Sequence, residues 1–383
     1  MQLSYIARNT RASVIRAMFN EALKIEDRVS FTVGEPDFTT PKPIIDEAVD
    51  AWRRGLTHYT PNRGIPELCD AISTFHADNL KPDPNEQVLC TCGAMEALQL
   101  ALITLVDPGD EVVLVTPAWS NYFGHIAMVG GVCKEIWAKE ENEFVPMLDD
   151  FKQVITEKTK LIILNSPSNP TGAVFDEDTL RGVAELAVEH DLFVISDEIY
   201  SKIIYDGRRC PSITEFPGIA ERTVYISGFS KMFAMTGWRL GYAISTPEII
   251  SAMTKLHENS ASCLPEPTQL AAVRALESCW DEVEMMRQSY ERRRDLICKL
   301  LNDIEGISVR VPKGAFYAFV NIKSAGMNSV DFCMDLLKKT GVVTVPGTGF
   351  GDAGEGYMRL TYATSDENII EGMKRLKQYM QAR

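Results

Sequence analysis

The 383-residue chain has 45% hydrophobic and 24% charged residues, the balance of a globular enzyme with one very large domain or two. Its formal net charge of −14 argues against the basic face that binds nucleic acid or an anionic membrane, although local sites for anionic substrates stay open. No apolar stretch reaches membrane-spanning length and residues 1–20 lack a secretory signal, so we expect a cytoplasmic protein.

The cysteine content excludes a complete disulfide framework, because the chain has nine cysteines, an odd number. We expect reduced thiols. Cys90 and Cys92 form a close pair, but no second pair or histidine cluster accompanies them. The spacing therefore predicts no metal site.

The first third of the chain alternates between expected helices at residues 11–23, 41–54, 66–75 and 93–106 and short strands at 31–33 and 87–91. A turn begins at Gly34, where the missing side chain lets a backbone group approach a ligand. The helix at 93–106 is apolar almost all round, which predicts burial. Its first amides, around Gly93 to Met95, lack intrahelical partners and suit a phosphate.

The middle of the chain contains apolar runs of strand length at residues 111–115, 160–164, 193–196 and 223–227. Helical stretches separate these runs, which predicts a mostly parallel sheet covered on both faces. Ligands bind beyond the carboxyl ends of the strands in such sheets. The side chains expected to converge there, after four different strands, are Trp119, Asn169, Asp197, Tyr200 and Lys231.

The composition changes from about residue 282. Helices are expected at residues 285–301, 330–339 and from 366 onward, and strands at 306–310 and 314–320. We therefore expect three parts: an N-terminal arm (1–40) that contributes to the small domain, a large domain (41–283) and a small C-terminal domain (284–383).

Lys231 follows a buried strand, where a strongly hydrated ammonium is unusual unless a ligand consumes its charge. Schiff-base formation with an aldehyde would do so. Ser230 offers a hydroxyl beside the lysine, and the planar guanidinium of Arg239 suits a phosphate dianion. An aldehyde that carries a phosphate suggests pyridoxal 5′-phosphate. The alternative for this segment alone is a strand end with a solvated lysine and arginine.

Six separated segments resemble the motifs of class I aminotransferases, the fold-type I pyridoxal-phosphate enzymes, in the family's order. They are residues 33–38, 59–61, 165–172, 196–200, 230–242 and 358–360, and together they span nearly the whole chain. The resemblance implies an α/β fold with a large domain, whose mostly parallel sheet is covered by helices, and a smaller α/β domain at the C-terminus.

The resemblance also implies roles for the candidate residues. Lys231 would hold the cofactor aldehyde and then act as general base, and Asp197 would keep the pyridine nitrogen protonated. Asn169 and Tyr200 would hydrogen-bond the phenolic oxygen, and Trp119 would stack on the ring. The phosphate contacts would come from Gly93, Ala94, Met95, Ser230, Arg239 and, across a dimer interface, Tyr59.

Substrate binding and the reaction follow from the same resemblance. Arg359 would clamp the substrate α-carboxylate, with Gly34 and Asn169 beside it. The implied reaction is a ping-pong transfer of the amino group of an aspartate-like or aromatic L-amino acid to a 2-oxo acid such as 2-oxoglutarate, in a homodimer with shared active sites. The alternative is a C–S β-lyase on the same scaffold. An amino-acid sensor fits poorly, because no basic DNA-binding module precedes residue 30.

The sequence departs from the family's pattern close to the lysine, and it contains one motif of a different class of protein. Many relatives have a hydroxyl residue three positions before the lysine, whereas this chain has Gly228; whether Ser227 substitutes is open, and Ser230 carries more of the expected phosphate binding. Residues 349–354 fit the dinucleotide fingerprint G-x-G-x-x-G. However, residues 357–362 after it are expected to form a strand instead of a helix, which argues against a nicotinamide or flavin site.

Overall fold

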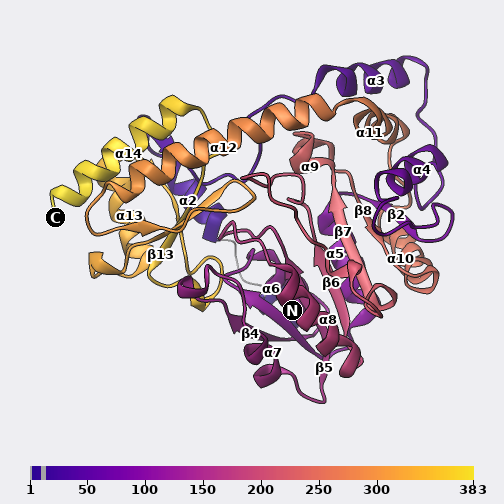
Figure 1. Cartoon of the computed structure of the whole chain (residues 1–383). Helices are drawn as coiled ribbons and strands as arrows, with labels where there is room; N and C mark the ends of the chain where they lie inside the picture. The colour runs from indigo at the N-terminus through magenta and orange to yellow at the C-terminus, as the bar shows by residue number, and fades with distance from the viewer. Residues whose placement is uncertain (1, 10–13) are drawn as a thin grey trace.

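The computed structural model describes residues 2–9 and 14–383. Its largest sheet has seven strands in the order β2-β8-β7-β6-β5-β3-β4 (Figure 1). Their bounds are β2 (Val88–Thr91), β3 (Glu111–Thr116), β4 (Val132–Trp137), β5 (Thr159–Asn165), β6 (Phe193–Asp197), β7 (Thr223–Gly228) and β8 (Gly241–Ile244). Only β8 runs antiparallel to its neighbours in this sheet, which confirms the predicted mostly parallel arrangement.

The central strands are continuously apolar because both faces of the sheet are covered. On β5, Leu161 and Ile163 pack in the cluster that contains the side chains of α5 (Ala94–Leu105) and of α10 (Pro247–Ser260). The alternate residues, Ile162 and Leu164, pack in the cluster that contains α8 (Glu177–Glu189). This alternation follows from the two-residue repeat of a strand.

A second, four-stranded sheet follows in the sequence. Its order is β12-β13-β10-β9, with antiparallel pairing, and its strands are β9 (Ser308–Val309), β10 (Tyr317–Asn321), β12 (Val345–Pro346) and β13 (Tyr357–Thr361). A two-stranded parallel pair joins β1 (Val29–Ser30) to β11 (Val342–Val343). The N-terminal arm is therefore hydrogen-bonded to the C-terminal part of the chain.

The helix α12 (Trp280–Asn302) runs as one piece of 23 residues from the side of the large sheet to the second sheet (Figure 1). It contacts α11 (Glu266–Ser278) near its start and also α14 (Asp366–Gln381). Its Arg293 pairs with Asp37 (2.8 Å) and with Asp366 (3.3 Å). The helix thus connects both parts of the molecule to the segment that follows Gly34.

The remaining helices lie around the two sheets. They are α1 (Tyr5–Asn9), α2 (Val14–Ala22), α3 (Lys42–Arg53), α4 (Pro66–Phe75), α6 (Asn121–Met128), α7 (Leu148–Val154), α9 (Phe229–Met232) and α13 (Ser329–Thr340). Short 3₁₀ turns link them. Within the described ranges, we find no helix whose length and apolar composition would let it cross a bilayer.

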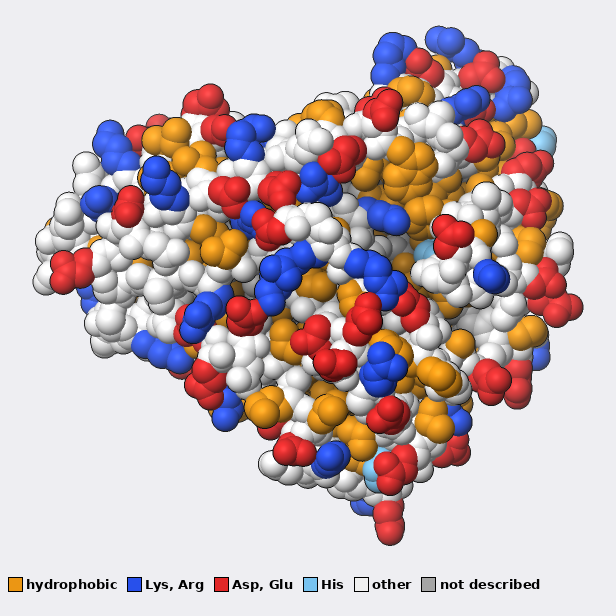
Figure 2. Space-filling view, viewed as in Figure 1, with side chains coloured by type: hydrophobic (Ala, Val, Ile, Leu, Met, Phe, Trp, Pro, Cys, Tyr) orange, Lys and Arg blue, Asp and Glu red, His pale blue; other side chains and the backbone are white. Residues whose placement is uncertain are grey.

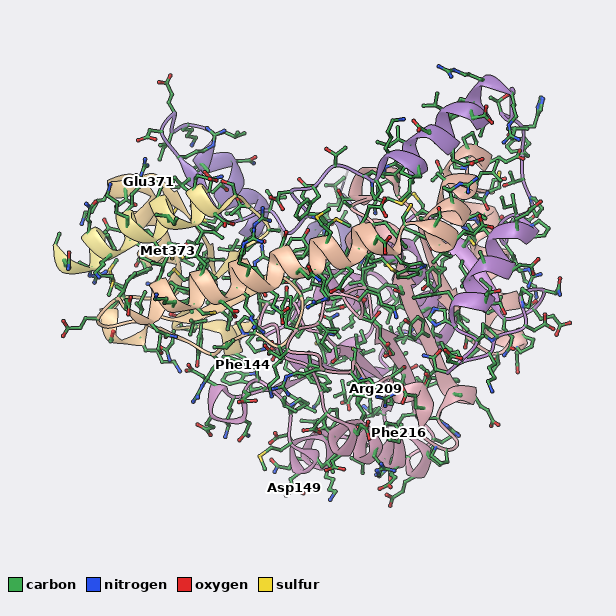
Figure 3. All side chains as sticks on the ribbon, turned by 45° about the horizontal axis from the view of Figure 1, so that its top comes forward. Phe144, Asp149, Arg209, Phe216, Glu371 and Met373 are labelled. Atoms are coloured by element: carbon green, nitrogen blue, oxygen red, sulfur yellow. The ribbon has the colours of Figure 1, made fainter. Side chains whose placement is uncertain are left out.

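The two sheets share one apolar contact region. Phe144, labelled in Figure 3, precedes α7 in the sequence and lies where the two parts of the molecule meet. Its ring packs edge-on against Phe319 of β10 (5.5 Å) and Tyr357 of β13 (5.7 Å). On the face shown in Figure 2, basic side chains are interspersed with acidic ones and form no broad basic surface.

One expected strand is displaced, and one expected helix is only partly described. The strand expected at residues 31–33 is wrong in position, because β1 covers Val29–Ser30. Phe31 still donates its amide to Val343 O (2.9 Å), but the chain then leaves the sheet toward a cavity lined by Val33 and Gly34. Of the helix expected at 11–23, residues 11–13 lie outside the described residues, and α2 covers Val14–Ala22.

Candidate active site

A cavity of about 560 Å³ lies at the carboxyl ends of β5, β6 and β7. It is closed on one side by β10 and β13 of the second sheet, which supply Tyr317 and Arg359. The cavity brings together most of the candidate residues: Gly34, Ala94, Met95, Trp119, Asn169, Asp197, Tyr200, Ser230, Lys231, Arg239 and Arg359. These residues come from segments more than 300 positions apart in the sequence.

Lys231 lies in the short helix α9, directly after β7. Its Nζ donates a hydrogen bond to Gly34 O (2.7 Å) and lies 6.0 Å from the centroid of the Tyr200 ring. Desolvation in the cavity lowers the pKa of Lys231 to about 8, and the positive charges of Arg239 and Arg359 act in the same direction. A substantial fraction of this amine is therefore neutral, and nucleophilic, near physiological pH.

Asp197 ends β6 and is buried. Burial raises the pKa of its carboxyl group, although Tyr122 donates to Oδ2 (2.6 Å) and the Ile199 amide donates to Oδ1 (3.2 Å). A buried carboxylate of this kind is stabilised by a positively charged partner. Tyr122, on α6, has no signal in the sequence that marks it as a site residue.

Arg359 of β13 is the largest fully buried side chain of the described residues. Its Nη1 donates to Asn169 Oδ1 (3.0 Å) and its Nη2 donates to Thr32 O, while its Nε is buried and has no partner. Burial lowers its pKa. The guanidinium lies over the rings of Tyr317 (4.6 Å) and Phe350 (4.9 Å). A buried cation with a free donor is suited to an incoming carboxylate.

Tyr317 connects three of the candidate residues and was missed at the sequence level. Its hydroxyl is 2.8 Å from the hydroxyl of Tyr200 and donates to Gly34 O at 3.5 Å, while its ring supports Arg359. Burial raises the pKa of both tyrosine hydroxyls, so both are protonated and available as donors.

The first turn of α5 forms a second polar region of the site. Gly93 precedes the helix with φ 76°, and a Cβ there would lie 2.6 Å from Arg239 Nη2. The guanidinium therefore lies directly against the positive end of the helix, where the amides of Ala94 and Met95 have no intrahelical acceptor. Ser230 lines the same cavity.

The structure gives a physical reason for Gly228. A Cβ at this position would lie 2.8 Å from Gly241 Cα and 3.0 Å from Leu240 O, so the close approach of β7 and β8 leaves no room for a side chain. Ser227 does not line the cavity, and its hydroxyl donates to Glu198 O (3.5 Å).

Two aromatic candidates lie in different surroundings. Trp119 lines the cavity and packs at right angles to Tyr122, with ring centroids 5.4 Å apart. Tyr59 does not line it, and its side chain is 88% exposed. Residues 349–354 contain a short 3₁₀ helix (Asp352–Gly354) and are followed by the strand β13, whereas the dinucleotide fingerprint must open an α-helix, so its geometry is absent from this segment.

Comparison with known proteins agrees with this combination of fold and site. Residues 26–376 match the model of the aminotransferase class I and II family, and the chain belongs to this family. It is 44% identical to the aspartate aminotransferase of Pyrococcus abyssi, over 96% of this chain and 95% of that protein. It is 41% identical to the aromatic-amino-acid aminotransferase 2 of Thermococcus litoralis, over 99% and 98% of the two chains.

A solved structure supports the same assignment. The aspartate aminotransferase of Thermus thermophilus with maleate superposes with a TM-score of 0.94 at 37% identity, and the match covers 99% of each chain. The predicted fold class and the predicted transaminase activity are therefore confirmed.

Proposed function

We propose that this transaminase binds pyridoxal 5′-phosphate in the cavity and transfers the amino group of an aspartate-like or aromatic L-amino acid to a 2-oxo acid such as 2-oxoglutarate. The observation that carries the proposal is the meeting of a lysine of lowered pKa, a buried carboxylate and a buried arginine in one cavity. The names of the aspartate and aromatic-amino-acid aminotransferases among the relatives support the choice of donor.

The residues present fit the cofactor. The buried carboxylate of Asp197 suits a protonated pyridine nitrogen, and the cradle of Gly93 and Arg239 suits a phosphate. Ser230, Ala94 and Met95 add phosphate donors. When bound, pyridoxal phosphate supplies an aldehyde for the amino group and a ring that takes up the electrons left when the substrate Cα loses its proton.

Lys231 performs the proton transfer in this proposal. Lys231 lines the cavity, where its Nζ donates a hydrogen bond to Gly34 O. As a neutral amine, Lys231 would remove the proton from the substrate Cα and deliver it to the aldehyde carbon of the cofactor, which receives the amino group. Tyr122 holds Asp197 in position for the ring nitrogen, and Trp119 provides an aromatic face.

Substrate orientation depends on Arg359. Asn169 and Thr32 fix the two terminal nitrogens of the guanidinium, so its plane is set before the substrate arrives. The α-carboxylate would pair with this cation beside the backbone of Gly34. Tyr200, with Asn169, would hydrogen-bond the phenolic oxygen of the cofactor.

The proposal includes a cytoplasmic homodimer and a division of the chain into an arm (1–40), a large domain (41–283) and a small domain (284–383). The exposure of Tyr59, 88% in one chain, supports a shared site, because an aromatic side chain so exposed is available to a second subunit. In the dimer, Tyr59 would reach the cofactor phosphate of the other subunit.

Two substitutions test the proposal. Lys231→Ala removes the amine, so it should abolish the visible absorbance of bound cofactor and the transfer of amino groups to 2-oxoglutarate. Asp197→Asn should retain the cofactor but lower kcat by several orders of magnitude, because the amide does not stabilise a protonated ring. Wild-type turnover by either variant would refute its assigned role, and release of pyruvate from cystathionine without amino transfer would favour the lyase.

A further inference from the structure

Two cysteines outside the active-site cavity lie against one another. Cys69 on α4 and Cys90 on β2 are both buried, with exposures of 4% and 0%, and their thiols interact as a hydrogen-bonded pair. The Cys90 amide donates to Arg63 O (2.8 Å), and the Cys69 thiol donates to the same oxygen at 3.9 Å. Two consecutive elements of the chain, α4 and β2, thus bring the two thiols together.

The two thiols have different acidities. The hydrogen bond from Cys90 lowers the pKa of Cys69, with help from the charge of Arg63, and this effect exceeds that of burial. The same hydrogen bond, together with burial, raises the pKa of Cys90. Burial raises the pKa of the thiols of Cys298 and Cys333 elsewhere in the core. The pair therefore combines a thiol that ionises more readily with a protonated neighbour.

Small solutes reach Cys69 from one side. An open cavity of about 680 Å³ is lined by Cys69 together with Arg63, Asp70 and Lys255. Gly64 covers Cys90, because a Cβ on this glycine would lie 2.7 Å from the Cys90 sulfur. An oxidant as small as hydrogen peroxide therefore meets Cys69 first and finds Cys90 behind it.

We propose that Cys69 and Cys90 form a dithiol site that hydrogen peroxide oxidises to a disulfide. The Cys69 thiolate attacks one peroxide oxygen, the O–O bond breaks, and Cys69 becomes a sulfenic acid as hydroxide leaves. The Cys90 sulfur then attacks the Cys69 sulfur, the S–S bond forms, and the S–O bond breaks with release of water. In total, two thiols lose two electrons and peroxide is reduced to two waters.

The site is separate from the amino-transfer chemistry, since neither thiol lines the active-site cavity. It is nevertheless connected to the site by the chain. Cys90 lies three residues before Gly93 on the strand that leads into α5, and its amide holds the loop that contains Tyr59 through Arg63 O. The disulfide would join α4 covalently to β2, the strand that leads to the first turn of α5, where we expect the cofactor phosphate to bind.

Peptide mapping of the native holoenzyme tests the proposal. The enzyme is treated with a small excess of peroxide, free thiols are blocked with N-ethylmaleimide in denaturant, and the chain is cut before aspartate residues. Cleavage before Asp70 and Asp83 puts the two cysteines in separate peptides. We expect a disulfide-linked pair that dithiothreitol separates, formed at least about tenfold faster than oxidation of Cys298.

Single substitutions separate the two chemical steps. In Cys90→Ser, the Cys69 sulfenic acid has no thiol to attack it and should accumulate, so that dimedone labels Cys69. Cys92→Ser, the matched control, removes an exposed neighbouring thiol and should leave the disulfide unchanged. A wild-type map in which Cys69 stays free while the exposed Cys92 is oxidised would overturn the proposal, as would a disulfide to Cys92. The peptide map of the wild-type enzyme decides the question even if the Cys90 variant does not fold.

Discussion

At the scale of single residues, the pKa of Lys231 sets the pH at which its amine becomes reactive. A lysine in water ionises near 10.5, whereas burial lowers the pKa of Lys231 to about 8. When the pKa of a lysine is lowered, the neutral amine predominates at every pH above the lowered pKa, and the amine is protonated at a pH below it. We therefore predict that the rate at which the apoenzyme reacts with pyridoxal, which has no phosphate, rises with pH with a midpoint near 8.

The reaction is followed by the visible absorbance of the product, with Lys231→Ala as the control that should not react. A midpoint near the pKa of an ordinary lysine would show that the cavity does not lower the pKa of this amine.

The two functions of Tyr317 can be separated by substitution. Tyr317→Phe removes the hydroxyl that contacts Tyr200 and Gly34 but keeps the ring under Arg359. We predict a fall in kcat of roughly tenfold, equivalent to about 1.4 kcal/mol for one lost hydrogen bond, with KM little changed. Tyr317→Leu also removes the ring that supports the guanidinium, so KM should rise as well.

Steady-state kinetics with one amino donor distinguish these outcomes. Equal kcat values for the wild type and the Phe variant would show that the hydroxyl pair has no role in turnover.

The sequence reveals the residues whose chemistry is unusual for their position. Lys231 was predicted as a site residue because a charged amine after an apolar strand is uncommon, and Asp197 because it follows another strand of the same expected sheet. Arg359 was predicted from the resemblance to the family. The structure places all three in the cavity. Tyr122 and Tyr317 carry no such signal, since a tyrosine in an apolar helix or strand is ordinary core composition. Their contribution depends on distances between elements, which a linear pattern does not contain.

At the scale of elements, the start of α5 depends on a glycine. We predict that Gly93→Ala weakens binding of pyridoxal phosphate roughly tenfold or more, because its Cβ would displace the Arg239 guanidinium, 2.6 Å away. Gly55→Ala is a matched control: Gly55 has nearly the same φ, 78° against 76°, but no atom within 4 Å of its Cβ position.

Both variants should lose stability because alanine is strained at a positive φ. The loss should be larger for Gly93→Ala, because the ψ of 165° at Gly93 belongs to a region that only glycine adopts readily, and only this variant should bind the cofactor less tightly. Fluorescence titration of the apoenzymes with pyridoxal phosphate measures the difference. Equal affinities would exclude a specific effect of this turn.

Glu198, next to the end of β6, is a buried carboxyl group from which we expect a pH dependence of stability. Its carboxyl group accepts hydrogen bonds from Ser196 (2.9 Å) and Ser212 (2.6 Å), and burial raises its pKa from 4.5 to about 8. Because the pKa of Glu198 is higher in the folded protein than in the unfolded chain, its protonation stabilises the fold. This contribution to stability is complete below pH 4.5 and is lost as the pH rises through 8. Between these values, each pH unit costs about 1.4 kcal/mol at most.

We predict that Glu198→Gln, which keeps the acceptor oxygen but does not ionise, becomes more stable relative to the wild type as the pH rises from about 5 to about 8. Urea unfolding at several pH values measures this difference in unfolding free energy. Glu189→Gln, at an exposed position on α8, should show no such trend. Parallel pH profiles for the wild type and Glu198→Gln would contradict the prediction.

Most strands of the large sheet were predictable because they are continuous apolar runs bounded by turns. β4 (Val132–Trp137) escaped prediction, because it is an edge strand in which only Ile136 is buried, and such a strand has little apolar pattern. The strand expected at 31–33 failed for a different reason. Apolar residues continue beyond β1 because Phe31 packs in the core and Val33 lines the active-site cavity, and the pattern does not distinguish these surroundings from a sheet.

At the scale of the whole molecule, the proposed exchange of Tyr59 between subunits allows a complementation experiment. Tyr59→Ala should weaken cofactor binding, and Lys231→Ala should be inactive. In a mixed dimer of the two variants, one active site would contain both wild-type residues, because its tyrosine comes from the other chain. We predict that unfolding and refolding the two variants together restores about a quarter of the wild-type activity at limiting cofactor.

The control is the same pair of proteins mixed without refolding, which should show no gain. Activity equal to the sum of the separate variants after refolding would show that Tyr59 serves its own subunit or no site at all.

The unbroken course of α12 limits how the two sheets can move relative to one another. A helix of 23 residues is about 35 Å long and bends little, so the two sheets do not swing freely about a flexible connection. If α12 moves as a rigid rod, a tilt of about 5° at its α11 end would displace its far end by about 3 Å. Arg293, near the middle of α12, forms an ion pair with Asp37, so such a tilt would also shift the nearby carbonyl of Gly34, which accepts the hydrogen bond from Lys231. Access to the compartment and release of the amine would then occur as one movement.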